Sequence, residues 1–126
     1  MRKIKLQGGI ALTTVIVLSG VLLTTGIAIA ITAIDLRKAS EAATDNFVAE
    51  SYSLTCLDES VNKLKFNPTY TGNFSLTLPD GDCSSVITNN ANPNYKDVAI
   101  MSSKGRSIVE VSYVLDVSDY PFQIVN

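Results

Sequence analysis

The chain has 126 residues, which is enough for one small domain and an anchor but too short for two independent domains. Its formal charge is −2, and it is more acidic still beyond the basic residues at its start, which argues against nonspecific affinity for nucleic acid or anionic lipid. The chain contains no histidine, the commonest general base and metal ligand in proteins. We find no candidate catalytic site, and we expect a protein that is not an enzyme, with no cofactor, no metal site and no specific recognition of nucleic acid.

An apolar segment at 10–34 follows the basic residues Arg2, Lys3 and Lys5. No charged residue occurs between Lys5 and Asp35. As a helix the segment would measure about 37 Å, and the hydrocarbon core of a bilayer is about 30 Å thick. Its only polar side chains are hydroxyls, which can bond back to helix carbonyls. Because basic residues favour the cytoplasmic side, we expect a transmembrane helix whose following chain lies outside.

Two other interpretations of this N-terminus stay open. A cleaved secretory signal is one, because Ala28-Ile29-Ala30 fits a signal-peptidase site. The apolar run before that site has about 20 residues, however, whereas the apolar region of a secretory signal typically has roughly 7–15. The other interpretation is an ordinary single-pass anchor that carries a small outer domain.

Helical character continues beyond the apolar segment, from Asp35 to Phe66. This stretch has no Pro and no Gly, and its apolar residues recur at spacings of three, four or seven. Asn67-Pro68 then stops the helix. One helix over 10–66 would be about 85 Å long, and its second half needs a covering partner other than the membrane.

After Pro68 the apolar period changes from that of a helix to that of a strand. We expect strands at 73–78, 83–88, 95–101 and 108–115, a turn at 79–82, a loop at 89–94 and a hairpin loop at 102–105. Asp80-Gly81-Asp82 lacks the full spacing of a calcium loop, so a hairpin turn is favoured there. The fold class we expect is α+β: a long N-terminal helix whose outer half packs on a four-stranded antiparallel sheet at 73–116.

Two cysteines, Cys56 and Cys83, both follow the apolar segment and so lie on the expected oxidising side. An even count there favours one disulfide, and two buried free thiols are the alternative. The bridge would close a loop of about 27 residues and stabilise the fold by about 3–4 kcal/mol. If it forms, the sheet must cover the helix arc that contains Cys56. That arc consists of Ala49, Ser53, Cys56, Leu57, Ser60 and Leu64.

The chain begins with basic residues, continues with Gly8-Gly9 and then enters a long apolar helix. This order resembles the N-terminal signal of type IV prepilins. The resemblance implies that a membrane prepilin peptidase cuts after Gly9 on the cytoplasmic side and makes Ile10 the new N-terminus. Ile10-Ala11-Leu12 is similar to the family's Phe-Thr-Leu-type opening, with Leu12 at the leucine. Thr14 stands where pilins usually carry a glutamate, which in the family neutralises a neighbour's N-terminal ammonium. This departure implies a minor or divergent subunit.

The downstream chain extends the resemblance. The helical run 56–60, the segment 67–73, the glycine-containing turn and Cys83 are similar to small pilin-like proteins of ultrasmall episymbiotic bacteria. Such a protein has a leader at 1–9, a transmembrane and filament-core helix at 10–34 and an extracytoplasmic domain at 35–126. It is inserted in the inner membrane as a precursor and assembled into a cell-surface filament for adhesion, motility or DNA uptake. The alternative function is that of a single-pass, membrane-anchored binding or sensory module.

The resemblance also implies partners and contacts. The partners are identical or related pilin subunits, the prepilin peptidase, the pilus assembly platform, the membrane, and a host or neighbouring cell surface. We expect filament contacts at Leu12, Thr14, Gly20, Gly26 and Phe47. Each glycine weakens the helix by about 1 kcal/mol relative to alanine, and the family implies that this stretch loosens during assembly. For Phe47 there are two interpretations: a contact with neighbouring subunits, or a place in the helix–sheet core.

Overall fold

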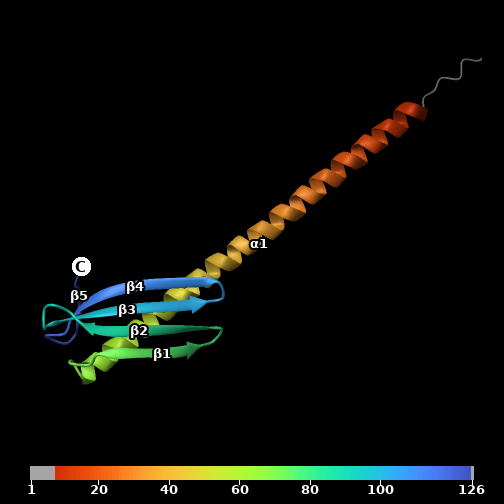
Figure 1. Cartoon of the computed structure of the whole chain (residues 1–126). Helices are drawn as coiled ribbons and strands as arrows, with labels where there is room; N and C mark the ends of the chain where they lie inside the picture. The colour runs from red at the N-terminus through yellow and green to blue at the C-terminus, as the bar shows by residue number, and fades with distance from the viewer. Residues whose placement is uncertain (1–7, 126) are drawn as a thin grey trace, which may run out of the picture. The chain divides into compact units, whose positions relative to one another are not determined.

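The structure, a computed structural model, describes residues 8–125, so the basic residues Arg2, Lys3 and Lys5 lie outside the described part. Within residues 8–125 the chain forms one helix and five strands (Figure 1). They are α1 (Gly8–Phe66), β1 (Gly72–Leu78), β2 (Gly81–Asn89), β3 (Tyr95–Lys104), β4 (Ser107–Asp116) and β5 (Gln123–Val125). The chain divides into two compact units, the first ending at Ser40 and the second beginning at Glu41.

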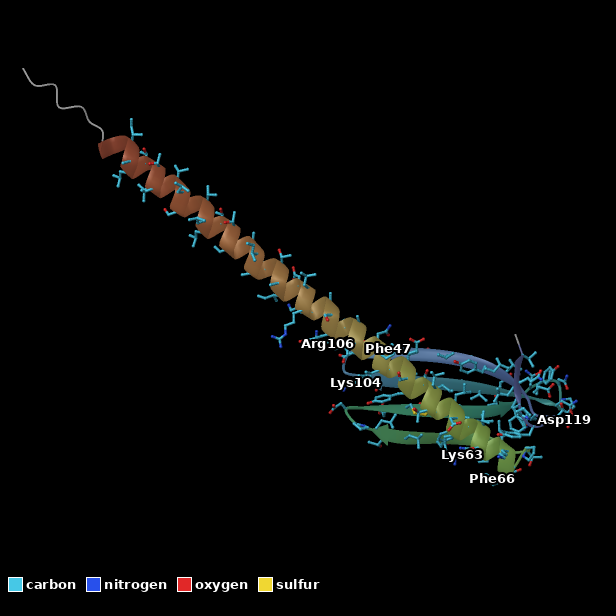
Figure 2. All side chains as sticks on the ribbon, turned by 180° about the vertical axis from the view of Figure 1, so that it is seen from behind. Phe47, Lys63, Phe66, Lys104, Arg106 and Asp119 are labelled. Carbon is cyan, nitrogen blue, oxygen red and sulfur yellow. A yellow bond between two sulfur atoms is a disulfide. The ribbon has the colours of Figure 1, made fainter. Side chains whose placement is uncertain are left out.

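The first unit holds the apolar part of α1. Every residue from Gly9 to Ser40 is exposed, and side chains stand out on all sides of this stretch (Figure 2). By length and composition the helix is able to cross a membrane. Its hydroxyl side chains donate to carbonyl oxygens three or four residues earlier, at 2.8–3.1 Å, as the sequence predicts. These hydroxyls therefore need no water as a partner.

In the second unit, β1 to β5 form one antiparallel sheet in which each strand pairs with the next along the chain (Figure 1). The four predicted strands are confirmed: β2 and β4 extend beyond both predicted ends, β1 begins one residue earlier, and β3 ends three residues later. The predicted hairpin loop at 102–105 is wrong, because β3 continues to Lys104 and Ser102 pairs with Val109. Ser102 is tolerated in the strand because its buried hydroxyl donates to the Ala49 carbonyl oxygen at 2.6 Å.

The sheet has one strand more than the four that the sequence predicts. β5 pairs with residues Val114, Leu115 and Asp116 of β4. A strand of three residues is too short to show an alternating apolar pattern, so the sequence gives no signal for it. The sheet therefore extends past 116, and Phe122, just before β5, packs against the core.

The turn between β1 and β2 is a tight hairpin, as predicted, but it spans only Pro79 and Asp80 and not 79–82, because Leu78 pairs with Gly81 and β2 begins there. Asp80 has φ of 60°, a conformation that aspartate tolerates better than most residues, and its carboxylate lies 3.1 Å from the Lys104 ammonium. Gly81 is required here, because a Cβ at this position would lie 2.2 Å from the Ser103 carbonyl oxygen. Within residues 8–125 no group of three or more acidic, cysteine or histidine side chains is placed to hold a metal.

Residues 41–66 of α1 cover one face of the sheet (Figure 1). The buried side of the helix consists of five of the six residues in the predicted arc: Ala49, Ser53, Cys56, Ser60 and Leu64 are each at most 1% exposed. Four of these five side chains are small, which lets the helix backbone approach the sheet closely. Leu57, the sixth, is half-buried and packs against the core. A disulfide joins the helix to the sheet through Cys56 and Cys83, with the Cα atoms 6.2 Å apart, and the predicted pairing is confirmed.

The interior between α1 and the sheet is partly polar. The apolar core is formed by Leu64, Ile87, Val98, Ile100 and Leu115 with the disulfide. Beside it lie the buried serines 53, 60, 85 and 102. Within residues 8–125 no buried side-chain nitrogen or oxygen lacks a hydrogen-bond partner. The serines therefore fill the narrow helix–sheet space without the cost of an unpaired polar group.

Candidate assembly surface

The predicted processing site, Gly8, Gly9 and Ile10, lies in the first turn of α1. The sequence predicts that the helix starts at Ile10, whereas it starts at Gly8, a difference within the usual uncertainty of helix ends. The first four N–H groups of any helix lack intrahelical acceptors, and glycine lowers helix stability further. This turn is therefore held by fewer intrahelical hydrogen bonds than the middle of α1. A Cβ built on Gly9 would meet nothing within 4 Å.

Leu12 and Thr14 are both exposed on the first unit. The Thr14 hydroxyl donates to the carbonyl oxygens of Ile10 and Ala11, at 2.9 Å each, so it is engaged within its own helix. From Gly9 to Ile34 there is no acidic side chain. This part of the helix therefore offers no carboxylate to a neighbour's ammonium.

The helix is uninterrupted through Gly20 and Gly26. The Thr24 hydroxyl donates to the Gly20 carbonyl oxygen at 3.1 Å, which adds a contact across the first glycine. A Cβ built on either glycine would meet nothing within 4 Å. Within the single chain, no steric contact requires glycine at these two positions. That the helix loosens around them in a filament stays a prediction.

Phe47 lies on the outer side of α1 and is 70% exposed (Figure 2). The interpretation that places it in the helix–sheet core is therefore wrong for the single chain. Leu54, two turns later on the same side, is also exposed. We call Phe47 and Leu54 the outer helix patch. The helix turns its small residues to the sheet and two large apolar residues away from it.

A second apolar area lies on the outward face of the sheet. Val86 on β2 pairs with Ala99 on β3, and Met101 follows two residues later on the same face. Val86 and Met101 are exposed and border a hollow of about 220 Å³. Val86 and Met101 were not among the residues expected to form contacts, although the alternation in β2 and β3 places them opposite the buried Ile87 and Ile100.

By its structure the protein belongs to the class of small α+β domains that are closed by a disulfide. The helix of this domain is part of α1, which also contains an exposed apolar segment long enough to span a membrane. Comparison of the chain with protein-family models, with curated proteins and with solved structures finds no match.

Proposed function

We propose that the chain is a structural, non-enzymatic subunit of a type IV pilus-like filament. It is inserted in the inner membrane as a precursor, cut after Gly9 by a prepilin peptidase and assembled at the cell surface. The observation that carries this proposal is the continuity of α1, which runs from Gly8 to Phe66 without a linker between its apolar segment and its sheet-covered segment.

The physical argument starts from the exposed surface of the first unit. Apolar side chains from Ile10 to Ile34 face outward on every side, so this segment needs lipid or other apolar helices around it in all directions. Lipid satisfies this need in a precursor. Copies of the same segment satisfy it in a filament, where their helices bundle together. A subunit that moves from one environment to the other keeps its apolar surface covered throughout.

The outer helix patch supports the same proposal. Large apolar side chains exposed on a small domain favour a partner surface. A contact between Phe47 and a neighbouring subunit would continue the helix packing beyond the apolar segment. The partners of this proposal are identical or related subunits, the peptidase and the assembly platform. The assembled filament then mediates adhesion, motility or DNA uptake.

Processing distinguishes this function from that of a single-pass anchored binding or sensory module, which has no reason to lose its leader. The experiment is intact-mass analysis of the full-length chain co-expressed with a prepilin peptidase. We expect a mature mass that begins at Ile10, and Gly9→Leu should leave the leader attached. Gly26→Ala, a matched glycine change away from the cut, should be processed normally.

Two outcomes would contradict the proposal. An uncleaved precursor, in the presence of a peptidase that processes a known prepilin, favours the anchored module. A mature mass that begins at Ile31 shows secretion by signal peptidase.

A further inference from the structure

A polar hollow of about 470 Å³ opens at the end of the second unit where α1 stops. Figure 2 labels Phe66 at this end of the unit and Lys104 at the other. The hollow lies between the α1–β1 connection and the β2–β3 loop, and its volume is typical of small-molecule sites, roughly 300–1,000 Å³. It is lined by Pro68, Thr69, Asn89, Asn90, Ala91, Pro93, Tyr95 and Lys96.

Both walls of the hollow are fixed by hydrogen bonds. In the α1–β1 connection, the Asn67 side-chain oxygen accepts from the Thr69 amide at 3.2 Å and from its hydroxyl at 2.7 Å. In the β2–β3 loop, the Asn90 side chain accepts from the Asn92 amide at 3.0 Å and donates to Asp97 at 2.7 Å. A proline in each wall adds rigidity. Binding here would therefore require little ordering of the protein.

Lys96 is the unusual member of the lining. It is only 5% exposed, and its ammonium donates to the Asn89 side-chain oxygen at 2.5 Å. An ammonium has three donors, and a neutral amide does not balance its charge. None of the described residues that line the hollow carries a carboxylate. The neighbouring Asp97 accepts from Asn90 instead. A nearly buried positive charge thus borders a hollow whose other polar groups are amides and hydroxyls.

We propose that this hollow binds an acidic saccharide of the uronic acid class. The sugar carboxylate binds the Lys96 ammonium, which is a charge-assisted contact. The Asn89 side-chain nitrogen can donate to a sugar hydroxyl, because Lys96 engages only the Asn89 oxygen. The Thr69 hydroxyl donates to Asn67 and can still accept, and the Tyr95 hydroxyl can do both. The ligand is either a free sugar acid or a unit of a polyuronate. This site does not depend on the filament function, since its residues all belong to the second unit.

The test is isothermal titration calorimetry of the full-length chain in detergent micelles. Galacturonate and galactose form a matched ligand pair that differs in the carboxylate. We expect galacturonate to bind at least about tenfold more tightly, the usual effect of a charge-assisted hydrogen bond. Trigalacturonate binding more tightly than the monomer indicates a polyuronate, and equal affinity indicates a free sugar acid.

Three variants locate the site. Lys96→Met should lower galacturonate affinity at least about tenfold and bring it close to that of galactose. Ala91→Trp, at an exposed loop position on the rim, should block binding of both sugars while leaving Lys96 and the core intact. Lys104→Met, at the other end of the same strand, should leave binding unchanged.

Several outcomes would overturn the proposal. They are an absence of saturable heat with galacturonate, equal affinity for galactose, displacement by inorganic phosphate at the same concentration, and unchanged binding in folded Ala91→Trp. A melting curve shows whether Lys96→Met folds. If it does not fold, the comparison of galacturonate with galactose and the Ala91→Trp variant still test the proposal.

Discussion

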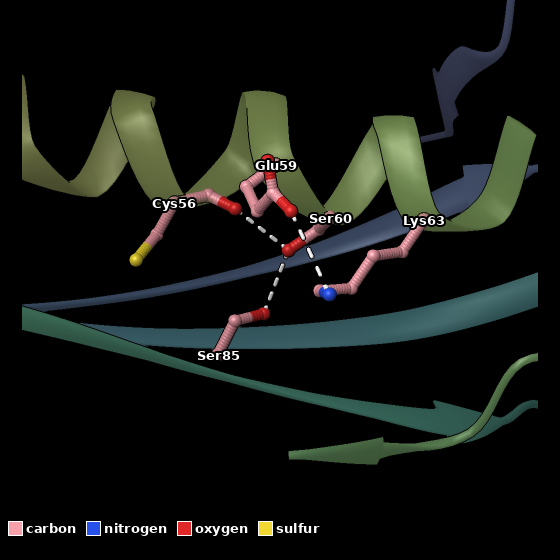
Figure 3. A network of polar contacts seen from close by, with 5 residues as sticks. All are labelled: Cys56, Glu59, Ser60, Lys63 and Ser85. Carbon is pink, nitrogen blue, oxygen red and sulfur yellow. Dashed lines mark hydrogen bonds and ion pairs between the residues drawn. The ribbon is translucent and has the colours of Figure 1, made fainter. Parts of the chain in front are cut away.

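The side-chain oxygens of Ser60 and Ser85 lie 2.8 Å apart in the interior between α1 and β2 (Figure 3). The Ser60 hydroxyl also donates to the Cys56 carbonyl oxygen at 2.7 Å. Since a hydroxyl has one proton to give, Ser85 must be the donor to Ser60. Cys56 lies one helical turn from Ser60 and is covalently joined to β2. The helix is thus joined to the same strand by a covalent bond and by a buried hydrogen bond, one turn apart.

This assignment predicts unequal effects of two conservative changes. Ser60→Ala removes the acceptor that the described residues provide for the Ser85 proton and should destabilise the fold by about 1–3 kcal/mol. Ser85→Ala leaves Ser60 still donating to Cys56, so it should cost only about 1 kcal/mol. Urea unfolding of the full-length chain in detergent, followed by near-UV circular dichroism, measures both. Ser51→Ala, at an exposed position of the same helix, is the control. A larger loss for Ser85→Ala than for Ser60→Ala would show that the donor assignment is reversed.

The buried face of the helix could be predicted from the sequence, because the spacing of its residues and one disulfide determine which arc meets the sheet. The four longer strands could be predicted from their alternation. The serine contacts could not, because a serine pattern in a sequence is equally typical of loops and exposed faces. Ser102 shows this: the sequence predicts a loop there, whereas its hydroxyl donates to the Ala49 carbonyl oxygen across the interior.

Two further features depend on tertiary context. β5 exists because β4 offers a free edge, and its three residues carry no periodic signal of their own. Lys96 is buried although lysine is almost never buried unless paired, so composition predicts it at the surface. Of the candidate assembly residues, Phe47 lies outside the predicted buried arc, but the sequence left a core position and a subunit contact both open for it. The role of Phe47 in a filament could not be predicted, because the fold of one chain does not show how neighbouring copies pack.

Removal of the disulfide should destabilise the second unit strongly. Cys56→Ala with Cys83→Ala opens a loop closed across 27 residues, and the expected loss is about 3–4 kcal/mol in the chain-entropy description. Thermal unfolding of the full-length chain with and without a reducing agent measures it. The wild type should lose stability on reduction, whereas the double variant should be insensitive to the reducing agent. Equal stability of the oxidised wild type and the variant would contradict this expectation.

The glycines of the apolar segment give a test that separates helix stability from assembly. Gly20→Ala with Gly26→Ala meets no steric obstacle in the single chain and should stabilise the helix by about 1 kcal/mol per site. If the stretch loosens during assembly, filament yield should fall while membrane insertion and cleavage after Gly9 persist. Sedimentation of sheared filaments measures the yield. Ala28→Gly, the reverse change on the same helix, should not reduce the filament yield. An unchanged yield in the double alanine variant would show that the helix does not have to loosen for assembly.

The Phe47 side chain is 70% exposed on the side of α1 that faces away from the sheet. Phe47→Ala removes little buried area from the single chain, so its melting temperature should change little. If the outer helix patch contacts a neighbouring subunit, the same change removes a large apolar contact from every interface in the filament, and yield should fall steeply. Leu64→Ala is the matched control, because Leu64 is fully buried and its truncation should cost about 2–5 kcal/mol of stability. Normal filament yield from folded Phe47→Ala would show that the patch faces solvent in the assembly. A loss of several kcal/mol in Phe47→Ala itself would mean that the side chain packs in the core after all.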